Sequence, residues 1–176
     1  MNDQHVILVD EKDNVTGTIG KMEAHTKGIL HRAFSIFIFN SKNEMLLQQR
    51  AFSKYHSAGL WSNACCSHPY PGEDTKAAAR RRLQEELGFT TNIQKIFDFI
   101  YTTSFDNGLI ENEFDHVFIG ERDGDIKINP DEVHDYAFVS MRVLKQELQQ
   151  DPEKFTAWFH LAFPRIENWW AQNLNK

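Results

Sequence analysis

The segment FSIFIF, residues 34–39, restricts the fold of this chain more than any other stretch of it. Side chains of a β-strand alternate between two faces, and both faces of this segment are apolar except at Ser35. Such a strand is stable where other elements cover the sheet on both sides. The segment therefore predicts a sheet with structure packed against each of its faces.

Segments rich in β-branched and aromatic residues predict the strands. They lie at 5–9, 15–20, 32–39, 45–49, 97–105, 111–120 and 136–139. Helices are expected over 75–87, 143–150 and 153–163, and Pro164 is expected either to end the third helix or to open the next one. The fold class is therefore α+β, a mixed β-sheet flanked by helices.

The segment TKAAARRRLQEEL, residues 75–87, carries the clearest helix signals. Asp74 or Thr75 suits the N-cap. Gly88 suits the C-terminal end, because glycine adopts the left-handed conformation without steric cost. An apolar stripe at four-residue spacing marks the face that we expect to be buried: Ala79, Leu83 and Leu87.

Length and charge limit the classes of function. A chain of 176 residues suits one domain, 1–176, with a sizeable core. The net charge of −6 argues against a nucleic-acid partner, which would favour an excess of basic residues. No apolar run approaches the ~18–20 residues of a membrane span, and MNDQHVILVD lacks the pattern of a secretory signal. We therefore expect a cytoplasmic protein without a membrane partner, for which no oligomer is required.

The stretch WSNACCSHPY, residues 61–70, contains both cysteines of the chain. A disulfide between sequence neighbours is strained, and adjacent cysteines cannot connect distant parts of a fold. Two interpretations remain: a metal-ligand pair beside His68, or a nucleophile or acid in a catalytic pocket. A free thiol pair also agrees with a reducing cytoplasm.

The helix over 75–87 also carries charged pairs. Arg81 and Glu85 are four residues apart, and Arg82 and Glu86 have the same spacing, which by itself suits a solvated face with ion pairs. The wider segment resembles the Nudix box, G-x5-E-x7-R-E-U-x-E-E-x-G-U, whose carboxylates hold divalent cations against a diphosphate. It departs from the box where Ser67 replaces the first glycine and Arg82 replaces a glutamate. Because arginine suits phosphate and not a metal ion, the motif indicates a diphosphate and a metal but weakens a hydrolase function.

A row of carboxylates lies in the predicted strand IENEFDHVF, residues 110–118. Glu111, Glu113 and Asp115 share one face of that strand. Carboxylates this close repel one another unless something neutralises them, so the face is either a solvent-exposed edge or part of a metal site. The eight histidines of the chain could supply further ligands, but counting them does not select any.

Taken together, these motifs resemble type I isopentenyl diphosphate isomerase, a Nudix-like family, in its short bacterial form. The similarity covers nearly the whole chain: HVILVD, VTGTIGKMEAH, LHRAFS, LLQQRAFSKYHSAGLWSNACCSHPYPGE, AAARRRLQEELG, GLIENEFDHVF and AWF. The combination of SNACCSHP, a helix with a double arginine, and ENE is more specific than any one of them. The resemblance implies a Nudix-like fold and the reversible conversion of isopentenyl diphosphate to dimethylallyl diphosphate through a tertiary carbocation, in isoprenoid biosynthesis.

The resemblance also implies roles for individual residues. Catalysis is assigned to Cys66 and to a metal-bound Glu113 assisted by Tyr101, while Cys65 packs inward. The implied ligands of one divalent ion, Mn²⁺, Mg²⁺ or Zn²⁺, are His25, His31, His68, Glu111 and Glu113. A second ion, a Mg²⁺ that bridges the diphosphate, is assigned to Glu86. The implied substrate contacts are Lys21, Arg50, Lys54, Arg82 and, beside the cationic carbon, Trp158.

Two rival functions and one rival residue assignment stay open on the sequence. A Nudix hydrolase would release phosphate from nucleotide diphosphates, and a non-enzymatic diphosphate-binding module would bind its ligand without proton exchange. Core packing alone would account for Trp158, which lies at helical spacing with other aromatic residues.

Overall fold

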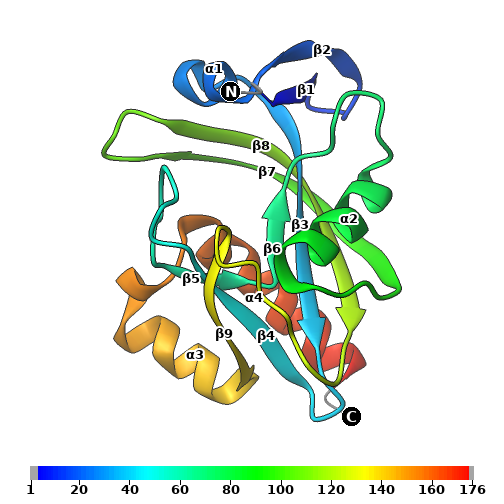
Figure 1. Ribbon diagram of the computed structural model, residues 1–176, viewed down its shortest axis with the longest axis vertical. Coiled ribbons are helices and arrows are strands. Elements are labelled where there is room, and N and C mark those ends of the chain that lie inside the picture. The colour runs from blue at the N-terminus through cyan, green and yellow to red at the C-terminus, as the bar shows by residue number, and fades with distance from the viewer. Residues whose placement is uncertain (1–3, 175–176) are drawn as a thin grey trace.

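Strand β3, His31–Phe39, runs through the middle of a mixed sheet in the computed structural model of the chain (Figure 1). The structure describes residues 4–174, so both ends of the predicted 1–176 domain lie outside it. β3 pairs in parallel with β8, Ile110–Glu121, from His31 to Phe39. Its other neighbours, β1, β4 and β6, are antiparallel to it. The predicted mixed sheet is therefore confirmed.

The other strands extend the sheet from this central pair. Within residues 4–174 they are β1 (His5–Val9), β2 (Val15–Gly20), β4 (Glu44–Arg50), β5 (Trp61–Asn63), β6 (Cys65–Ser67), β7 (Ile93–Ser104) and β9 (Val133–Ser140). β7 lies beyond β8, and β9 lies beyond β4. β1 connects β3 to β2 at the end of the sheet near the N-terminus (Figure 1).

The sheet divides between β3 and β4. These strands follow one another in the chain, but they pair at one position, Phe39 with Met45. Away from that position, β3 pairs with the short β6 and β4 pairs with the short β5. One half of the sheet is thus β7-β8-β3 and the other is β9-β4-β5. Residues from both halves line one pocket.

Helices cover both faces of the sheet, as the apolar segment predicts (Figure 1). The helical elements of residues 4–174 are α1 (Lys21–Lys27), α2 (Thr75–Leu87), α3 (Met141–Gln150), the 3₁₀ turn Pro152–Lys154 and α4 (Ala157–Asn173). Phe34, Ile36 and Ile38 pack in a core with α2. Phe37 and Phe39 point to the opposite face and pack in a second core with α3 and α4.

Helix α2 begins and ends as predicted. Asp74 is the N-cap, because its Oδ1 accepts a hydrogen bond of 2.9 Å from the Ala77 backbone N–H. Gly88 ends the helix with a φ of 72°, in the left-handed region. The predicted stripe of Ala79, Leu83 and Leu87 is buried in the core.

The last helix differs from its prediction. Residues 153–156 lie outside α4, which begins at Ala157 and continues through Pro164, so the expectation that Pro164 ends one helix or opens the next is wrong. A proline has no backbone N–H and leaves the carbonyl one turn earlier without its helical hydrogen bond. Phe159, Phe163 and Ile166, on both sides of the proline, are buried in the core, and their packing keeps the helix continuous.

Three short elements were not predicted: α1, β5 and β6. Each is at most seven residues long and has no side-chain pattern of its own, so tertiary contacts decide its conformation. Within residues 4–174, no helix combines the length and the apolar composition that crossing a bilayer requires.

Candidate active site

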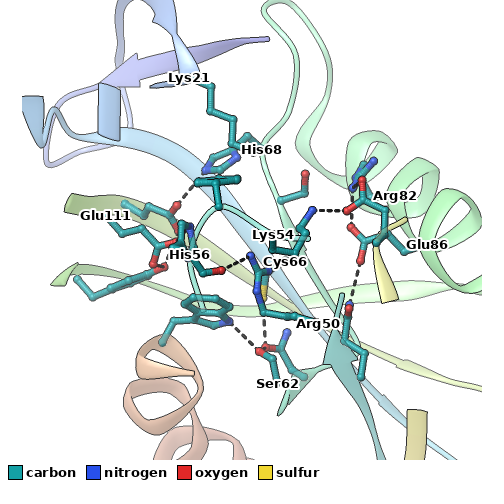
Figure 2. Close-up of a pocket in the computed structure, with 18 residues that line it drawn as sticks. Lys21, Arg50, Lys54, His56, Ser62, Cys66, His68, Arg82, Glu86 and Glu111 are labelled. Carbon is teal, nitrogen blue, oxygen red and sulfur yellow. Dashed lines mark hydrogen bonds and ion pairs between the residues drawn. The ribbon is translucent and has the colours of Figure 1, made fainter. Parts of the chain in front are cut away.

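A polar pocket lies between the two halves of the sheet (Figure 2). Eleven of the predicted site residues line it: Lys21, Arg50, Lys54, Cys66, His68, Arg82, Glu86, Tyr101, Glu111, Glu113 and Trp158. The remaining two, His25 and His31, are fully buried next to His68, with ring centroids 5.7 Å and 5.0 Å from its ring. Folding therefore brings all the predicted site residues into one region.

The pairing of β3, β7 and β8 positions the acidic side of the pocket. His31 is opposite Glu113 in the parallel pair, and Tyr101 of β7 is opposite Glu113 on its other side. Glu111, Glu113 and Asp115 share a face, as predicted, and all three are buried. The alternative of a solvent-exposed edge is therefore wrong for this strand.

Four buried groups converge at one point. His25, His31, His68 and Glu113 each offer a ligand atom, and these atoms lie within 4.8 Å of one another. A second group within the same distance, His25, His56 and Glu111, shares His25 with the first. Together with Glu111 the first four form the metal-ligand cluster of the following text. Its mixed nitrogen and oxygen donors suit Mn²⁺, Mg²⁺ or Zn²⁺.

The histidine tautomers support this interpretation. The Nδ1 atom of His25 lies 2.7 Å from the Lys21 carbonyl, and that of His31 lies 2.7 Å from the Ile29 carbonyl. A carbonyl accepts only, so both Nδ1 atoms carry the proton and, in the neutral ring, each Nε2 keeps a lone pair. Within the described chain, His25 Nε2 is buried without a hydrogen-bond partner. A buried lone pair without a partner is stabilised by a cation, and the ligand atoms of the four groups converge on one point, so the cluster fits a metal ion.

The pKa values of the two glutamates of the cluster are shifted in opposite directions. Burial opposes the charge on Glu113, but its contacts with the His31 and His68 rings outweigh burial and hold the pKa of Glu113 well below its usual range. Burial and the neighbouring Glu113 charge raise the pKa of Glu111 well above its usual range. Burial also lowers the pKa of His68 to about 3, so its ring is neutral. Without a bound cation, one carboxylate is ionised and the other favours its protonated form.

Tyr101 connects the two carboxylates. Its hydroxyl donates a hydrogen bond of 2.6 Å to Glu113 Oε2 and lies 3.2 Å from Glu111 Oε2. Burial, followed by the charges of Glu111 and Glu113, raises the pKa of Tyr101 well above its usual range. The phenol therefore keeps its proton and donates it in a short hydrogen bond to the ionised carboxylate of Glu113.

Cys66 lies on β6 and lines the same pocket. Its Sγ is 3.1 Å from Asn63 Oδ1 and 3.4 Å from Ser35 Oγ. Burial and the charge of Asp115 raise the pKa of the Cys66 thiol, so it is protonated at neutral pH. Cys65 points the other way and is fully buried in the core beside α2. The two cysteines are both free, and only Cys66 lines the pocket.

The other side of the pocket is cationic. Figure 2 shows Arg82 and Glu86 on the side opposite Glu111 and His56, with Cys66 between them. Arg82 Nη2 lies 2.7 Å from Glu86 Oε1 and 3.3 Å from Glu132 Oε1. We call the four basic residues that line the pocket, Lys21, Arg50, Lys54 and Arg82, the cationic cluster, of which Lys21 lies beside His68 (Figure 2). Their convergence gives a net acidic protein a local site for an anion.

Trp158 closes the pocket at the start of α4. It is 3% exposed, its Nε1 donates a hydrogen bond of 2.8 Å to Ser62 Oγ, and the Arg50 guanidinium lies 5.2 Å from its ring centroid. It is thus both a packed residue and a pocket wall, so core packing does not account for it alone. Its ring already accepts one cation.

Several pocket residues were not predicted: Gln48, Tyr55, His56, Ser62, Asn63, Ser67 and Glu132. Most lie on the loop 51–60 or beside the short strands, where no periodic pattern marks them. A signal was available for His56, which follows the basic segment RAFSK closely. A histidine in a loop is too frequent on surfaces for that signal to have selected it.

Comparison with known proteins agrees with this geometry. The NUDIX domain family matches residues 29–159. The chain is 53% identical to an isopentenyl-diphosphate Delta-isomerase of Pectobacterium atrosepticum, over 94% of this chain and 92% of that protein. It is 52% identical to the isopentenyl-diphosphate Delta-isomerase of Serratia proteamaculans, over 95% of this chain and 96% of that protein.

Solved structures share the fold at lower identity. A Deinococcus radiodurans protein superimposes with a TM-score of 0.68 at 18% identity, over 84% of this chain and 90% of that one. A MutT protein of Methanosarcina mazei gives a TM-score of 0.65 at 24% identity, over 79% of this chain and 94% of that one. These likenesses concern the fold alone, and they confirm the predicted Nudix-like architecture.

Proposed function

The chain belongs to the isopentenyl-diphosphate Delta-isomerase family and contains the NUDIX domain, and from this premise we propose how its pocket acts. It converts isopentenyl diphosphate to dimethylallyl diphosphate, a reaction of isoprenoid biosynthesis. The double bond moves when one carbon of the substrate gains a proton and another loses one. The pocket therefore needs a proton donor and a proton acceptor at one alkene, and a means of holding the diphosphate.

We propose that Cys66 and the Glu113–Tyr101 pair exchange protons with opposite faces of the alkene. In one direction of the reaction one of them delivers a proton and the other removes one, and in the reverse direction these roles are exchanged. The observation that supports this best is a neutral, protonated thiol in the same pocket as a hydrogen-bonded carboxylate–phenol pair. Glu113 and Tyr101 are buried and Cys66 is half-buried, so the pocket limits the access of water to the cationic intermediate.

The metal-ligand cluster is the proposed site of a divalent ion, Mn²⁺, Mg²⁺ or Zn²⁺. When bound, this ion supplies a fixed positive charge that favours the ionised form of Glu113. The support for it is the convergence of ligand atoms from His25, His31, His68 and Glu113 within 4.8 Å of one another, together with the buried His25 Nε2, which has no hydrogen-bond partner among the described residues. His25 and His31 are oriented toward that point by their Nδ1 hydrogen bonds to backbone carbonyls.

The cationic cluster is the proposed site of the diphosphate, since Lys21, Arg50, Lys54 and Arg82 converge on the pocket. Glu86 would hold a Mg²⁺ against it. Its Oε1 contacts Arg82 and its Oε2 accepts a hydrogen bond from Gln48, and each oxygen retains a second lone pair. Mg²⁺ needs one or two protein carboxylates beside phosphate oxygens, so the group fits. Trp158 is the proposed aromatic wall beside the tertiary cation.

We also propose that the enzyme works in the cytoplasm and requires no oligomer. The proposed acid Cys66 must stay a free thiol, which a reducing compartment ensures. Every residue assigned above belongs to a single chain. The expectation that nucleic acid and membranes are not partners stays a prediction from charge and composition.

The cysteines provide the sharpest test of the proton-transfer assignment. Cys66→Ala should reduce turnover of isopentenyl diphosphate by roughly 10³-fold or more, because it removes one of two proton-transfer groups. Cys65→Ala is the matched control and should retain most of the activity, since Cys65 lies in the core away from the pocket. The reverse pattern would show that the assignment chose the wrong sulfur. Phosphate release from nucleoside diphosphates, without allylic product, would favour hydrolysis instead.

A further inference from the structure

We propose that His56 is a positioning residue that fixes Glu111 in the metal-ligand cluster and connects that cluster to the aromatic wall of the pocket. The inference rests on the proposed function, because it takes Glu111 to be a metal ligand. His56 lies on the loop 51–60 between β4 and β5. Figure 2 shows its side chain on the same side of the pocket as Glu111.

The contact between His56 and Glu111 completes the environment of that carboxylate. His56 Nε2 lies 3.2 Å from Glu111 Oε1, and both side chains are buried. The other oxygen, Oε2, lies 3.2 Å from the Tyr101 hydroxyl. Each oxygen of Glu111 thus has one protein partner, which sets the rotation of the carboxylate plane and leaves one lone pair on each oxygen.

Aromatic packing holds the imidazole ring in place. It stacks on Phe105, with centroids 4.4 Å apart and planes inclined by 13°. Tyr55 and Trp158 contact it edge to face, at 4.5 Å and 5.9 Å. A ring packed between three aromatic side chains cannot rotate freely, so this packing keeps Nε2 directed toward Glu111. The same ring therefore connects Glu111 to Trp158.

The hydrogen bonds of His56 make it a partner of a ligand and not a ligand. Nδ1 lies 3.2 Å from Ser57 Oγ, which can donate to it. With Ser57 as the donor to Nδ1, Nε2 carries the proton and faces Glu111 Oε1 at the ion-pair distance of 3.2 Å, and a protonated ring nitrogen has no lone pair for an ion. His56 thereby acts as the hydrogen-bond donor that orients a metal ligand. Removing partners of this kind costs about 10–100-fold in metal affinity.

The test measures Mn²⁺ binding to chelator-treated protein by electron paramagnetic resonance, so that it does not depend on turnover. His56→Phe keeps the stacking and loses the donor, and should weaken Mn²⁺ binding by about 10–100-fold. His56→Gln keeps an N–H at a similar reach and should recover a large part of that loss. His134→Phe is the matched control, since His134 packs on Phe52 at 4.8 Å and does not line the pocket. It should bind Mn²⁺ as the wild type does.

A positioning role predicts a further result that a general packing defect would not give. Raising the Mn²⁺ concentration should restore most of the kcat of His56→Phe. A kcat that stays low at saturating Mn²⁺ would overturn the inference. If His56→Phe does not fold, His56→Gln and His56→Met replace it, because they have equal length and differ in the donor. Equal Mn²⁺ affinities for that pair would overturn the inference as well.

Glu111→Gln separates this inference from the function on which it rests. If Glu111→Gln binds Mn²⁺ as tightly as the wild type, the proposed ligand set is wrong. If Glu111→Gln binds weakly but His56→Phe binds normally, the ligand set stands and the inference about His56 is wrong. Weak binding by both variants, with recovery in His56→Gln, supports both.

Discussion

The two sides of the pocket are built in opposite ways. In the metal-ligand cluster, imidazole and carboxylate ligand atoms converge, and His25 Nε2 is buried without a hydrogen-bond partner within the described chain. In the cationic cluster, Arg82 and Lys54 already contact the carboxylates of Glu86 and Glu132. The first side is electrostatically incomplete until a cation arrives. The second is balanced by itself, and an anion must displace or join an existing partner. The sides should therefore respond differently to substitution.

Among substitutions on the two sides of the pocket, Glu113→Gln should reduce turnover the most. A smaller loss would contradict the view that the acidic side carries the main chemistry. It removes a proposed proton-transfer group and a charged member of the metal-ligand cluster together. Turnover should fall by roughly 10³-fold. The measurement is the conversion of isopentenyl diphosphate at saturating metal and substrate. Near wild-type activity would remove Glu113 from the proposed acid–base pair and leave the acidic side without its main function.

Removing the metal should lower the thermal stability of the protein, mainly because the metal-ligand cluster on the acidic side loses its ion. An ion present at a hundred times its dissociation constant stabilises the folded state by about 2.7 kcal/mol. For a chain of this length, that corresponds to a Tm shift of roughly 5–10 °C. Thermal unfolding before chelation, after it, and after Mn²⁺ is restored measures the shift.

A matched variant shows on which side the stabilising ion binds. Arg82→Met alters the cationic side and leaves the metal-ligand cluster intact, so it should show the same shift as the wild type. A shift that disappears in Arg82→Met would mean that the stabilising ion binds on the cationic side.

Glu132→Gln should have a moderate effect, and it should strengthen binding where the previous changes weaken activity or stability. Glu132 contacts Lys54 at 2.5 Å and Arg82 at 3.3 Å, where a diphosphate is proposed to bind. Removing its charge should strengthen binding of inorganic pyrophosphate by about 1 kcal/mol, or roughly fivefold. Isothermal titration calorimetry measures this. Glu153→Gln, on an exposed turn, is the control, and weaker binding by Glu132→Gln would show that Glu132 helps to hold the anion.

The smallest effect is expected outside the pocket, at Glu73. The hydrogen bonds of Arg81 hold the pKa of Glu73 below its ordinary value. A lowered folded pKa contributes stability above the unfolded pKa of about 4.3, and this is lost as pH falls through the folded pKa. Glu73→Gln should thus cost about 0.5–1 kcal/mol at pH 7 and progressively less below pH ~4. Urea unfolding at several pH values measures it, and a constant difference would contradict the assignment.

The sequence predicted best where local pattern and packing agree. In FSIFIF both faces are apolar, and in α2 the cap, stripe and terminal glycine all indicate one helix. The shared face of Glu111 and Glu113 also follows from strand alternation. Whether that face was buried could not be predicted, because burial depends on β3, which pairs with β8 from a distant part of the chain, and on the residues of the pocket that cover the face.

The site itself was predicted from the resemblance more than from residue patterns. His25 lies on a seven-residue helix and Cys66 on a three-residue strand, and neither has a periodic signal. His56 was missed because its contacts are with Phe105, Glu111 and Trp158, which are far from it in sequence. The path of α4 through Pro164 was missed because core packing outweighs the local cost of a proline.

The carboxylates beside Lys54 and Arg82 also determine how the enzyme responds to ionic strength. An open patch of positive charge gathers mobile ions from solution, which an arriving substrate must release. Here Glu86 and Glu132 act as counter-ions that belong to the protein, at contact distance and partly shielded from water. When the substrate binds, its phosphates replace or join these carboxylates beside Lys54 and Arg82. Substrate affinity should therefore depend only weakly on the salt concentration.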